Sequence, residues 1–424
     1  MDITFSPARS HDRLQSALAA LYGPQATPVQ AQRYRHLLSG LEETFGPQPR
    51  AALFSAPGRT EIGGNHTDHQ HGRVLTGSVN LDIIAAVAPT GGSLIRVQSE
   101  GFPLIEVDLA DLTARPEEHN TTAALIRGVA AWFAAQGHAL EGLCAYITSQ
   151  VLSGSGLSSS AAFEVLTATI LNDLFCGGQY DPVQIAKVGQ YAENLYFGKP
   201  SGLLDQMGAS VGGMVAIDFQ DNDNPQAAKV DFDFSAAGHA LCIVDSGADH
   251  ADLTPEYAAV PAELGEICAY FGKAVLREVP EDEFSAALPA LRRAAGDRAV
   301  LRAIHVYGEN RRVEGQVAAL QRGDFDGFLA LVRQSGLSSW RFLQDITPAG
   351  AVRHQEVALA LALAEQLLDG RGACRVHGGG FAGTIQAFVP LDLLDKFKAG
   401  MESVLGEGRC HVLAIRPVGG VRLV

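Results

Sequence analysis

The chain of 424 residues carries 32 Lys and Arg against 47 Asp and Glu, a formal net charge of −15, and no stretch gathers its basic residues into a stripe. This balance argues against nucleic-acid binding, which needs concentrated positive charge. The length and the 47% hydrophobic content are ordinary for a globular enzyme of two or three domains. The six cysteines form no CxxC pair, so the sequence indicates neither a disulfide framework nor a cysteine zinc site.

Targeting and membrane signals are weak. The start, MDITFSPARSHDRL, lacks the basic-then-apolar pattern of a secretory signal, and the apolar run at 357–368 is interrupted by Glu365. We therefore expect a cytoplasmic protein that binds small molecules rather than nucleic acid or a membrane. We expect it to be a monomer or a weak homo-oligomer.

The first third of the chain predicts helices followed by a sheet. Apolar residues at three-to-four spacing predict two or three short helices over 14–45. A short apolar strand then leads into a glycine-rich polar loop, and loops of that composition usually carry function. A mainly antiparallel sheet is expected. Its strands are predicted at 81–87, 94–98, 105–109 and 143–149, with a hairpin turn at 89–93 and a helix at 122–136.

The segment SGSGLSSSAA at 153–162 lies between a predicted strand and a long apolar helix. Gly154 and Gly156 allow backbone N–H groups to approach a ligand closely. The serines that follow place hydroxyls at the first helical turn, where four N–H groups lack partners. The segment predicts either an anion-binding helix start or an ordinary serine-capped helix after a glycine turn.

The second half is predicted to follow a polar surface segment at 218–233. Before it, a helix carries Glu193, and a glycine-bounded connection at 198–213 holds Asp205. After it, helical patterns dominate from 255 to 368. The remaining expected elements are a strand at 239–245, the glycine cluster VHGGGFAGT, a strand at 384–389, one helix and a closing strand pair at 411–416 and 420–424.

Three clusters, GRTEIGGNHTDH at 58–69, SGSGLSSSAA at 153–162 and HGGGFAGT at 377–384, stand in the order and rough spacing of the motifs of the GHMP small-molecule kinases. The first resembles the galactokinase signature, usually GRVNLIGEHTDY, and the resemblance continues from about Leu41 onward. It implies an α+β GHMP kinase fold, with an S5-like N-terminal domain, a ferredoxin-like C-terminal domain and an active site in the cleft between them. The implied division is a helical extension at 1–48, an N-terminal domain at 49–225 and a C-terminal domain at 226–424.

The resemblance implies phosphoryl transfer from ATP, with Mg²⁺, to the C1 hydroxyl of a sugar such as α-D-galactose. Asp205 would face the hydroxyl, and Arg59 would favour its ionised form and offset developing charge. Ser160 and Glu193 would hold the metal ion, a hard cation that prefers oxygen ligands. The resemblance further assigns sugar binding to Asn65, His66, Asp68, Tyr257 and Gly380, and nucleotide binding to Gly154, Ser155, Gly156, Leu157, Ser158 and Ser159.

The sugar motif departs from the family pattern at three positions, where Asn65 replaces glutamate, Glu61 replaces asparagine and His69 replaces tyrosine. A carboxylate at position 65 would accept a hydrogen bond from a sugar hydroxyl. The Asn65 amide can also donate and has no charge that repels a sugar acid. Galacturonate, N-acetylgalactosamine or another galacto-configured sugar is therefore an alternative to galactose, and a non-catalytic sugar sensor on the same fold is a third interpretation.

Two hydrolase interpretations agree less well with the sequence. Four side chains within six residues, His66, Asp68, His69 and His71, resemble zinc ligands but do not easily converge on one ion. HGGG at 377–380 imitates the oxyanion motif of lipases, yet the chain has no GxSxG segment and HGGG follows the serine loop instead of preceding it. We therefore favour a kinase.

Overall fold

The computed structural model describes residues 7–151, 156–199, 201–248, 253–381 and 383–424. Two sheets form the framework, with the strand orders β12-β1-β2-β5-β3-β4 and β11-β8-β10-β9; β6 pairs with β2, and β7 pairs with β6. The strands are β1 (Ala52–Gly63), β2 (Arg73–Pro89), β3 (Leu94–Ser99), β4 (Ile105–Asp108), β5 (Leu143–Ser149), β6 (Met214–Asp218), β7 (Gln226–Val230), β8 (His239–Asp245), β9 (Ala373–His377), β10 (Thr384–Pro390), β11 (Cys410–Leu413) and β12 (Val421–Arg422).

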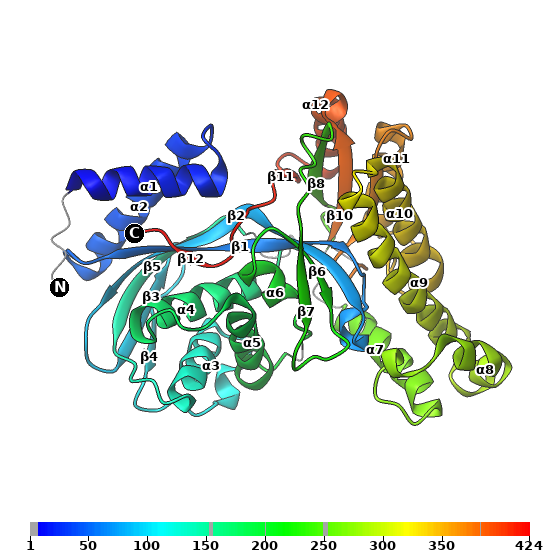
Figure 1. Cartoon of the computed structure of the whole chain (residues 1–424), viewed down its shortest axis with the longest axis horizontal. Coiled ribbons are helices and arrows are strands. Elements are labelled where there is room, and N and C mark those ends of the chain that lie inside the picture. Colours follow the sequence, from blue (N-terminus) through cyan, green and yellow to red (C-terminus); the bar gives the residue numbers. More distant parts are fainter. Residues whose placement is uncertain (1–6, 152–155, 200, 249–252, 382) are drawn as a thin grey trace.

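Helices cover both sheets, and the long strands β1 and β2 run from the N-terminal half into the helical C-terminal half (Figure 1). None of the helices in the described ranges is long and apolar enough to span a bilayer. The α-helices are α1 (Pro7–Tyr22), α2 (Thr27–Phe45), α3 (Thr122–Ala135), α4 (Ser159–Phe175), α5 (Pro182–Ala192), α6 (Leu204–Ser210), α7 (Thr254–Tyr270), α8 (Glu281–Ala294), α9 (Gly296–Gln321), α10 (Phe325–Ser338), α11 (Glu356–Leu368) and α12 (Leu394–Leu405). Short 3₁₀ turns are η1 (Asp68–Gln70), η2 (Pro116–Glu118), η4 (Leu276–Glu278) and η6 (Leu391–Leu393), and π turns are η3 (Glu193–Phe197) and η5 (Ser339–Leu343).

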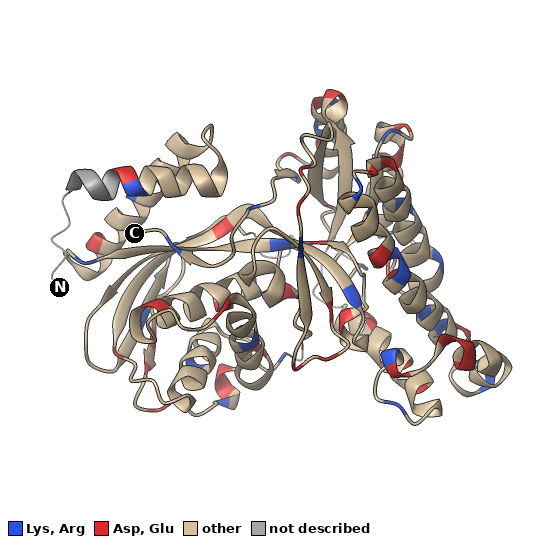
Figure 2. Cartoon of the chain, viewed as in Figure 1, with Lys and Arg blue, Asp and Glu red and all other residues tan. Residues whose placement is uncertain are grey.

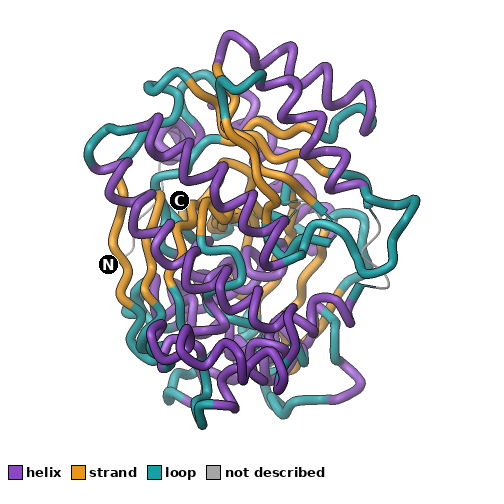
Figure 3. The backbone as a smooth tube through the Cα atoms, turned by 90° about the vertical axis from the view of Figure 1, so that its right-hand side faces the viewer, coloured by secondary structure: helices purple, strands orange, loops and turns teal. Residues whose placement is uncertain are grey.

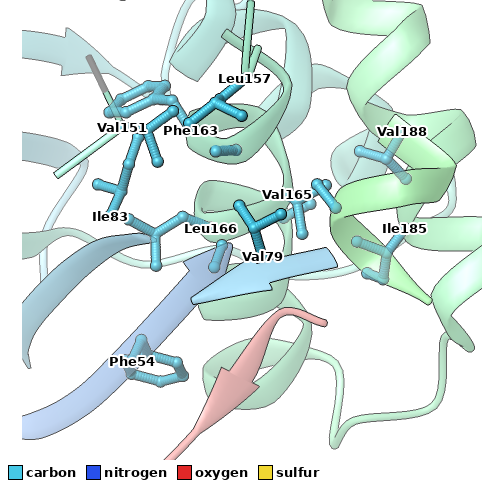
Figure 4. Packing of buried hydrophobic residues seen from close by; sticks show 14 of the residues in the cluster. Phe54, Val79, Ile83, Val151, Leu157, Phe163, Val165, Leu166, Ile185 and Val188 are labelled. Carbon is cyan, nitrogen blue, oxygen red and sulfur yellow. The ribbon is translucent and has the colours of Figure 1, made fainter. Parts of the chain in front are cut away.

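The first sheet is buried on both faces. Successive side chains of a strand point to opposite faces, so neighbouring residues enter different cores. On β2, Ile83 belongs to the core beneath α3, α4 and α5, whereas Ile84 belongs to the core beneath α1 and α2. Figure 4 shows the first of these cores, with Ile83 of the sheet below Val151 and below Phe163 of α4, and Phe54 farther along the same cluster. The N-terminal helices, to which the sequence assigned no function, therefore form the cover of the sheet's second face.

The second sheet also packs between helices. The alternating residues Ala240, Cys242 and Val244 of β8 face a core shared with α11 and α12, while Leu241 and Ile243 join the main core with residues of α10. Figure 3 views the molecule from the side where Figure 1 labels α8, α9 and α10, and helices lie in front of the strands in this view. Acidic and basic residues are interspersed along the ribbon in Figure 2, without a continuous basic stripe in that view.

Most of the predicted elements are confirmed, including the helices α1, α2 and α3 and the strands β5 and β8. The predicted hairpin at 89–93 is wrong, because β5 lies between β2 and β3, antiparallel to the first and parallel to the second. The backbone of the turn pairs with the start of β5: Thr90 N donates to Gly142 O (2.8 Å), and Gly142 N donates to Gly92 O (2.9 Å). The apolar strand β5 thus takes the position that a hairpin partner would have occupied.

Two further expectations need correction. The closing strand pair does not exist, because β11 pairs with β8 while β12 pairs with β1. The connection at 198–213 contains the helix α6, in which Leu204 and Met207 are buried one turn apart. Strands β7 and β12 both join the first sheet, so segments beyond residue 225 contribute to it. The division into domains at residues 48 and 225 stays a prediction.

Candidate active site

The three sequence motifs meet at one cleft of about 250 Å³. The first motif reaches it along β1, the second at the start of α4, and the third in the turn between β9 and β10. Segments near α5, α6 and α7 close the remaining sides. The lining residues are Arg59, Gly156, Ser158, Ser159, Ser160, Lys199, Asp205, Tyr257, His377, Gly378, Gly379, Gly383 and Thr384.

Asp205, in the first turn of α6, is held by two side chains from different elements. Arg59 Nε donates to Asp205 Oδ1 (2.7 Å), and the Ser158 hydroxyl donates to Asp205 Oδ2 (2.7 Å). Burial would raise the pKa of Asp205, but the charge of Arg59 and the hydrogen bond from Ser158 outweigh burial and hold the pKa below its usual range. Asp205 is therefore an ionised acceptor at neutral pH, facing the cleft.

The start of α4 lies directly against the first and third motifs. Arg59 donates from its backbone N to Leu157 O (3.0 Å) and from its guanidinium to Gly156 O. Gly156 has φ 71°, and a Cβ there would lie 2.4 Å from the Thr384 hydroxyl, so this position requires glycine. Leu157 is buried and presents its backbone, and Ser158 and Ser159 line the cleft. The predicted nucleotide-binding residues Gly154 and Ser155 lie outside the described residues.

His377 joins the first motif to the third. Its Nε2 accepts a hydrogen bond from the backbone N of Glu61 (3.2 Å), and its Nδ1 lies 2.9 Å from the Thr384 hydroxyl. Burial, together with the charges of Arg59 and Arg375, holds the pKa of His377 well below its usual value. The ring is therefore neutral, and since Nε2 is an acceptor, Nδ1 carries the proton and donates to Thr384.

Glu193 and Ser160 come together as predicted candidates for metal binding. The Ser160 hydroxyl lies 3.2 Å from Glu193 Oε1, and Glu193, in η3, is 1% exposed. Ser201 Oγ (2.6 Å) and Gln206 Nε2 (2.8 Å) both donate to Glu193 Oε2 and fix the carboxylate. No three His, Cys, Asp or Glu side chains cluster as metal ligands within the described ranges. One fixed carboxylate and one hydroxyl suit Mg²⁺, which keeps several waters and takes phosphate oxygens as further ligands.

The predicted sugar-binding residues lie at or behind one side of the cleft. Tyr257 lines it and donates from its hydroxyl to Gly380 O (3.0 Å). His66 Nε2 lies 3.1 Å from Gly379 O, which links the first motif to the third. Burial and the neighbouring charge of Asp205 raise the pKa of Asp68, so the two carboxyl groups titrate apart.

Asn65 is fully buried and does not line the cleft. Its amide nitrogen donates to Ser339 Oγ (3.0 Å) and to Asp345 Oδ2 (2.8 Å), so both N–H groups are used inside the protein. Asn65 Oδ1 and Asp345 Oδ1 are buried without a hydrogen-bond partner among the described residues. Burial raises the pKa of Asp345. Gly380 lies against this pair, because a Cβ there would be 2.7 Å from Asp345 Oδ2.

From the sequence we assigned no role to three side chains that line the cleft, Lys199, His377 and Thr384, or to Asp345 beside it. The available signal for His377 and Thr384 was the third motif itself, of which they are the first and last residues. For Lys199, the available signal was its position six residues after Glu193. Glu61, one of the departures from the family pattern, hydrogen-bonds to Arg375 of β9 and so has a structural partner in the second sheet.

Comparisons with known proteins agree with this geometry. Residues 40–89 match the galactokinase galactose-binding signature, and residues 124–213 match the GHMP kinase N-terminal domain. The galactokinase of Streptomyces coelicolor is 31% identical over 362 residues, which cover 85% of this chain and 90% of the relative. Human galactokinase is 32% identical over 377 residues, which cover 86% of this chain and 89% of the relative.

Solved structures show the same fold. Lactococcus lactis galactokinase, solved in complex with galactose, has a TM-score of 0.78 at 24% identity and covers 92% of this chain and 99% of its own. A mevalonate kinase has a TM-score of 0.61 at 13% identity and covers 86% of this chain and 99% of its own. The fold and the meeting of the three motifs define a small-molecule kinase of the GHMP class. The chain belongs to the galactokinase family. The fold and family expected from the sequence are confirmed.

Proposed function

We propose that the protein is an ATP-dependent sugar 1-kinase that converts α-D-galactose to α-D-galactose 1-phosphate by direct in-line transfer. One observation carries this proposal: Asp205 is ionised and held by Arg59 and Ser158 in the cleft that also contains the start of α4. Phosphoryl transfer leaves little covalent chemistry to the protein, so catalysis depends on positioning and charge. The proposal places the protein in the cytoplasm, as a monomer or weak homo-oligomer.

Each group in the cleft has a role in this proposal. Asp205 accepts and orients the proton of the attacking hydroxyl, and Arg59 offsets charge that develops during transfer. Backbone N–H groups of residues 156–159 hold the phosphates at the start of α4. Mg²⁺ would be held by Ser160 and Glu193 and would supply neutralisation of phosphate charge. The sugar is bound by residues of the first motif, of the third motif and of α7, with Asn65 behind them. These residues are His66, Asp68, Gly380 and Tyr257.

The buried surroundings of Asn65 favour a neutral sugar over a sugar acid. Both amide N–H groups of Asn65 are engaged by Ser339 and Asp345, so Asn65 has no donor left for a substrate carboxylate. In the cleft lining, Arg59 is paired with Asp205, and Lys199 lies against Glu193, a proposed metal ligand, rather than among the proposed sugar-binding residues. A sugar carboxylate would therefore add negative charge without a partner, which carries a large desolvation cost. Galactose, not galacturonate, is the substrate we propose.

A substrate panel tests this proposal. ATP consumption with Mg²⁺ is measured against galactose, galacturonate, N-acetylgalactosamine, glucose and arabinose, with identification of each phosphorylated product. We expect the highest kcat/KM for galactose, at least about tenfold above galacturonate, which corresponds to about 1.4 kcal/mol. A preference for galacturonate would contradict the argument from Asn65. Sugar binding without any turnover would support the sensor interpretation and overturn the kinase.

Replacement of Glu193 with Gln tests the assignment of the metal site. We expect the Mg²⁺ concentration for half-maximal activity to rise at least about tenfold, because the change removes the charged ligand and retains the shape. The matched control is Glu164→Gln. Burial and the charge of Glu193 hold the pKa of Glu164 well above its usual value and so favour its neutral form. An unchanged metal requirement in Glu193→Gln would remove Glu193 from the site.

A further inference from the structure

Lys199 is a charged residue of the cleft with no role in the mechanism described above. It follows η3 in the chain and lines the cleft together with Ser158, Ser160 and Asp205. Its ammonium group donates to Glu193 Oε1 (3.1 Å), and this is its one hydrogen bond to the described residues. The side chain is 55% exposed, whereas that of Glu193 is 2% exposed. The lysine is therefore an exposed partner, held by one side-chain hydrogen bond, of a buried carboxylate.

The ammonium stands where the proposed metal ion and the transferred phosphate would meet. It interacts electrostatically with Glu193 and also with Asp205, the group proposed to face the sugar hydroxyl. The transferred phosphate must lie between the nucleotide, bound near Ser160 and Glu193, and the attacking hydroxyl near Asp205. Lys199 lines the same cleft as Ser160 and Asp205, and its charge acts on both Glu193 and Asp205.

Arg59 is less able to serve this position. Its Nε and Nη2 both contact Asp205 Oδ1, and its Nη1 donates to Gly156 O. Lys199 keeps two of its three ammonium N–H groups for other acceptors, since its ammonium makes one hydrogen bond to the described residues. The arginine fixes Asp205, and the lysine is the cation available to a ligand.

Glu193 has other hydrogen bonds that do not depend on the Lys199 side chain. Ser201 and Gln206 still bind Oε2, and Ser160 still contacts Oε1. The backbone N of Lys199 donates to Glu193 O (3.1 Å), so the main chain stays in place while the side chain moves. A metal ion can therefore replace the ammonium at Oε1 without rearrangement of the backbone.

We propose that Lys199 is a further catalytic residue, whose ammonium leaves Glu193 when the nucleotide and its metal ion bind and then contacts the phosphate group that is transferred. This proposal rests on the proposed kinase function. The lysine binds the γ-phosphate of ATP and stabilises the charge spread over its oxygens during transfer. It makes no contact with a nucleotide that ends at the β-phosphate.

Nucleotide binding to Lys199→Met tests this contact directly. Calorimetry with Mg²⁺ compares ADP with a non-hydrolysable ATP analogue on the full-length protein. We expect the analogue to bind at least about tenfold more weakly than to the wild type, as for loss of a charge-assisted hydrogen bond. ADP should bind within about twofold of the wild type. Equal losses for both nucleotides would show that Lys199 only supports Glu193, and would overturn the proposal.

Steady-state kinetics provide a second test of the role of Lys199. Lys199→Met should lower kcat about 10²-fold, as expected for loss of one group that stabilises the transition state, with little change in the KM for sugar. Lys199→Arg should recover part of kcat, because it restores a positive charge without the compact geometry of lysine. Lys229→Met, on the exposed strand β7, is the control and should behave as the wild type. A kcat for Lys199→Met within about threefold of the wild type would overturn the proposal.

The two proposals fail in different ways. If the wild type turns over none of the sugars, the proposed function fails. The comparison of ADP with the ATP analogue is still measured in that case, and selective loss of the analogue would support the phosphate contact. Turnover by the wild type with equal nucleotide affinities in wild type and Lys199→Met would overturn the role of Lys199 alone.

Discussion

Asp205→Asn is expected to lower kcat by about 10²- to 10⁴-fold, the usual contribution of a positioned acid or base. The asparagine keeps the shape of the side chain and can still accept the hydrogen bond from Ser158, but it cannot take a proton from the sugar hydroxyl. Steady-state kinetics with galactose and ATP measure the effect. Nucleotide affinity, measured by calorimetry, should change only a few-fold because Asp205 faces the acceptor.

A matched control separates this effect from a general change of charge. Asp392→Asn removes one carboxylate from an exposed pair with Arg371, far from the cleft lining, and should leave kcat unchanged. If Asp205→Asn kept a kcat within about fivefold of the wild type, Asp205 would have no part in proton transfer. Catalysis would then depend on other groups of the cleft.

The second large effect concerns stability. Asp82→Ala is expected to lower the free energy of unfolding by about 3–5 kcal/mol, because it leaves buried arginines without a counter-charge. Arg33 Nη1 lies 2.5 Å from Asp82 Oδ1, and Arg416 Nη1 lies 2.9 Å from Asp82 Oδ2. Tyr22 and Ser55 also donate to this carboxylate. Urea denaturation followed by tryptophan fluorescence measures the loss.

The control for this prediction is a surface ion pair. Asp173→Ala removes the partner of Arg422, both partly exposed, and should cost no more than about 1 kcal/mol. Burial raises the pKa of Asp82, but Arg33 and Arg416 outweigh it, and the pKa lies below its usual value. The contribution of Asp82 is therefore fully present above a pH of about 3.9 and is lost only as the pH falls through the lower folded pKa. A loss below about 1 kcal/mol at pH 7 in Asp82→Ala would contradict this account.

The sequence predicted the parts of the fold that depend on local pattern. The strand β5 and the start of α4 follow from runs of apolar residues bounded by glycine and serine. The pairing of β5 was not predictable from a turn at 89–93, because the turn signal does not show which strand from elsewhere in the chain fills the neighbouring position. The closing strands failed for the same reason, since β11 and β12 each pair with a different sheet.

Side-chain contacts between distant segments of the site were likewise only partly predictable from the sequence. The resemblance to the family predicted that Arg59 acts on Asp205, and the structure places the two in one ion pair. The surroundings of Asn65 could not be predicted, because its partner Asp345 lies 280 residues later in a segment without a motif. This hydrogen bond changes the expected chemistry. The Asn65 amide, which the sequence indicated as able to donate to a substrate, donates to Asp345 in the fold.

The central claim is transfer of the γ-phosphate of ATP to the anomeric hydroxyl of galactose. Phosphorus NMR of the protein with MgATP and galactose tests it most directly, because an anomeric phosphate couples to the proton on C1 alone. The account predicts loss of the γ-phosphate resonance and growth of one doublet from α-D-galactose 1-phosphate. Inorganic phosphate alone, a triplet-like signal from a phosphate on C6, or no change in ATP would contradict it.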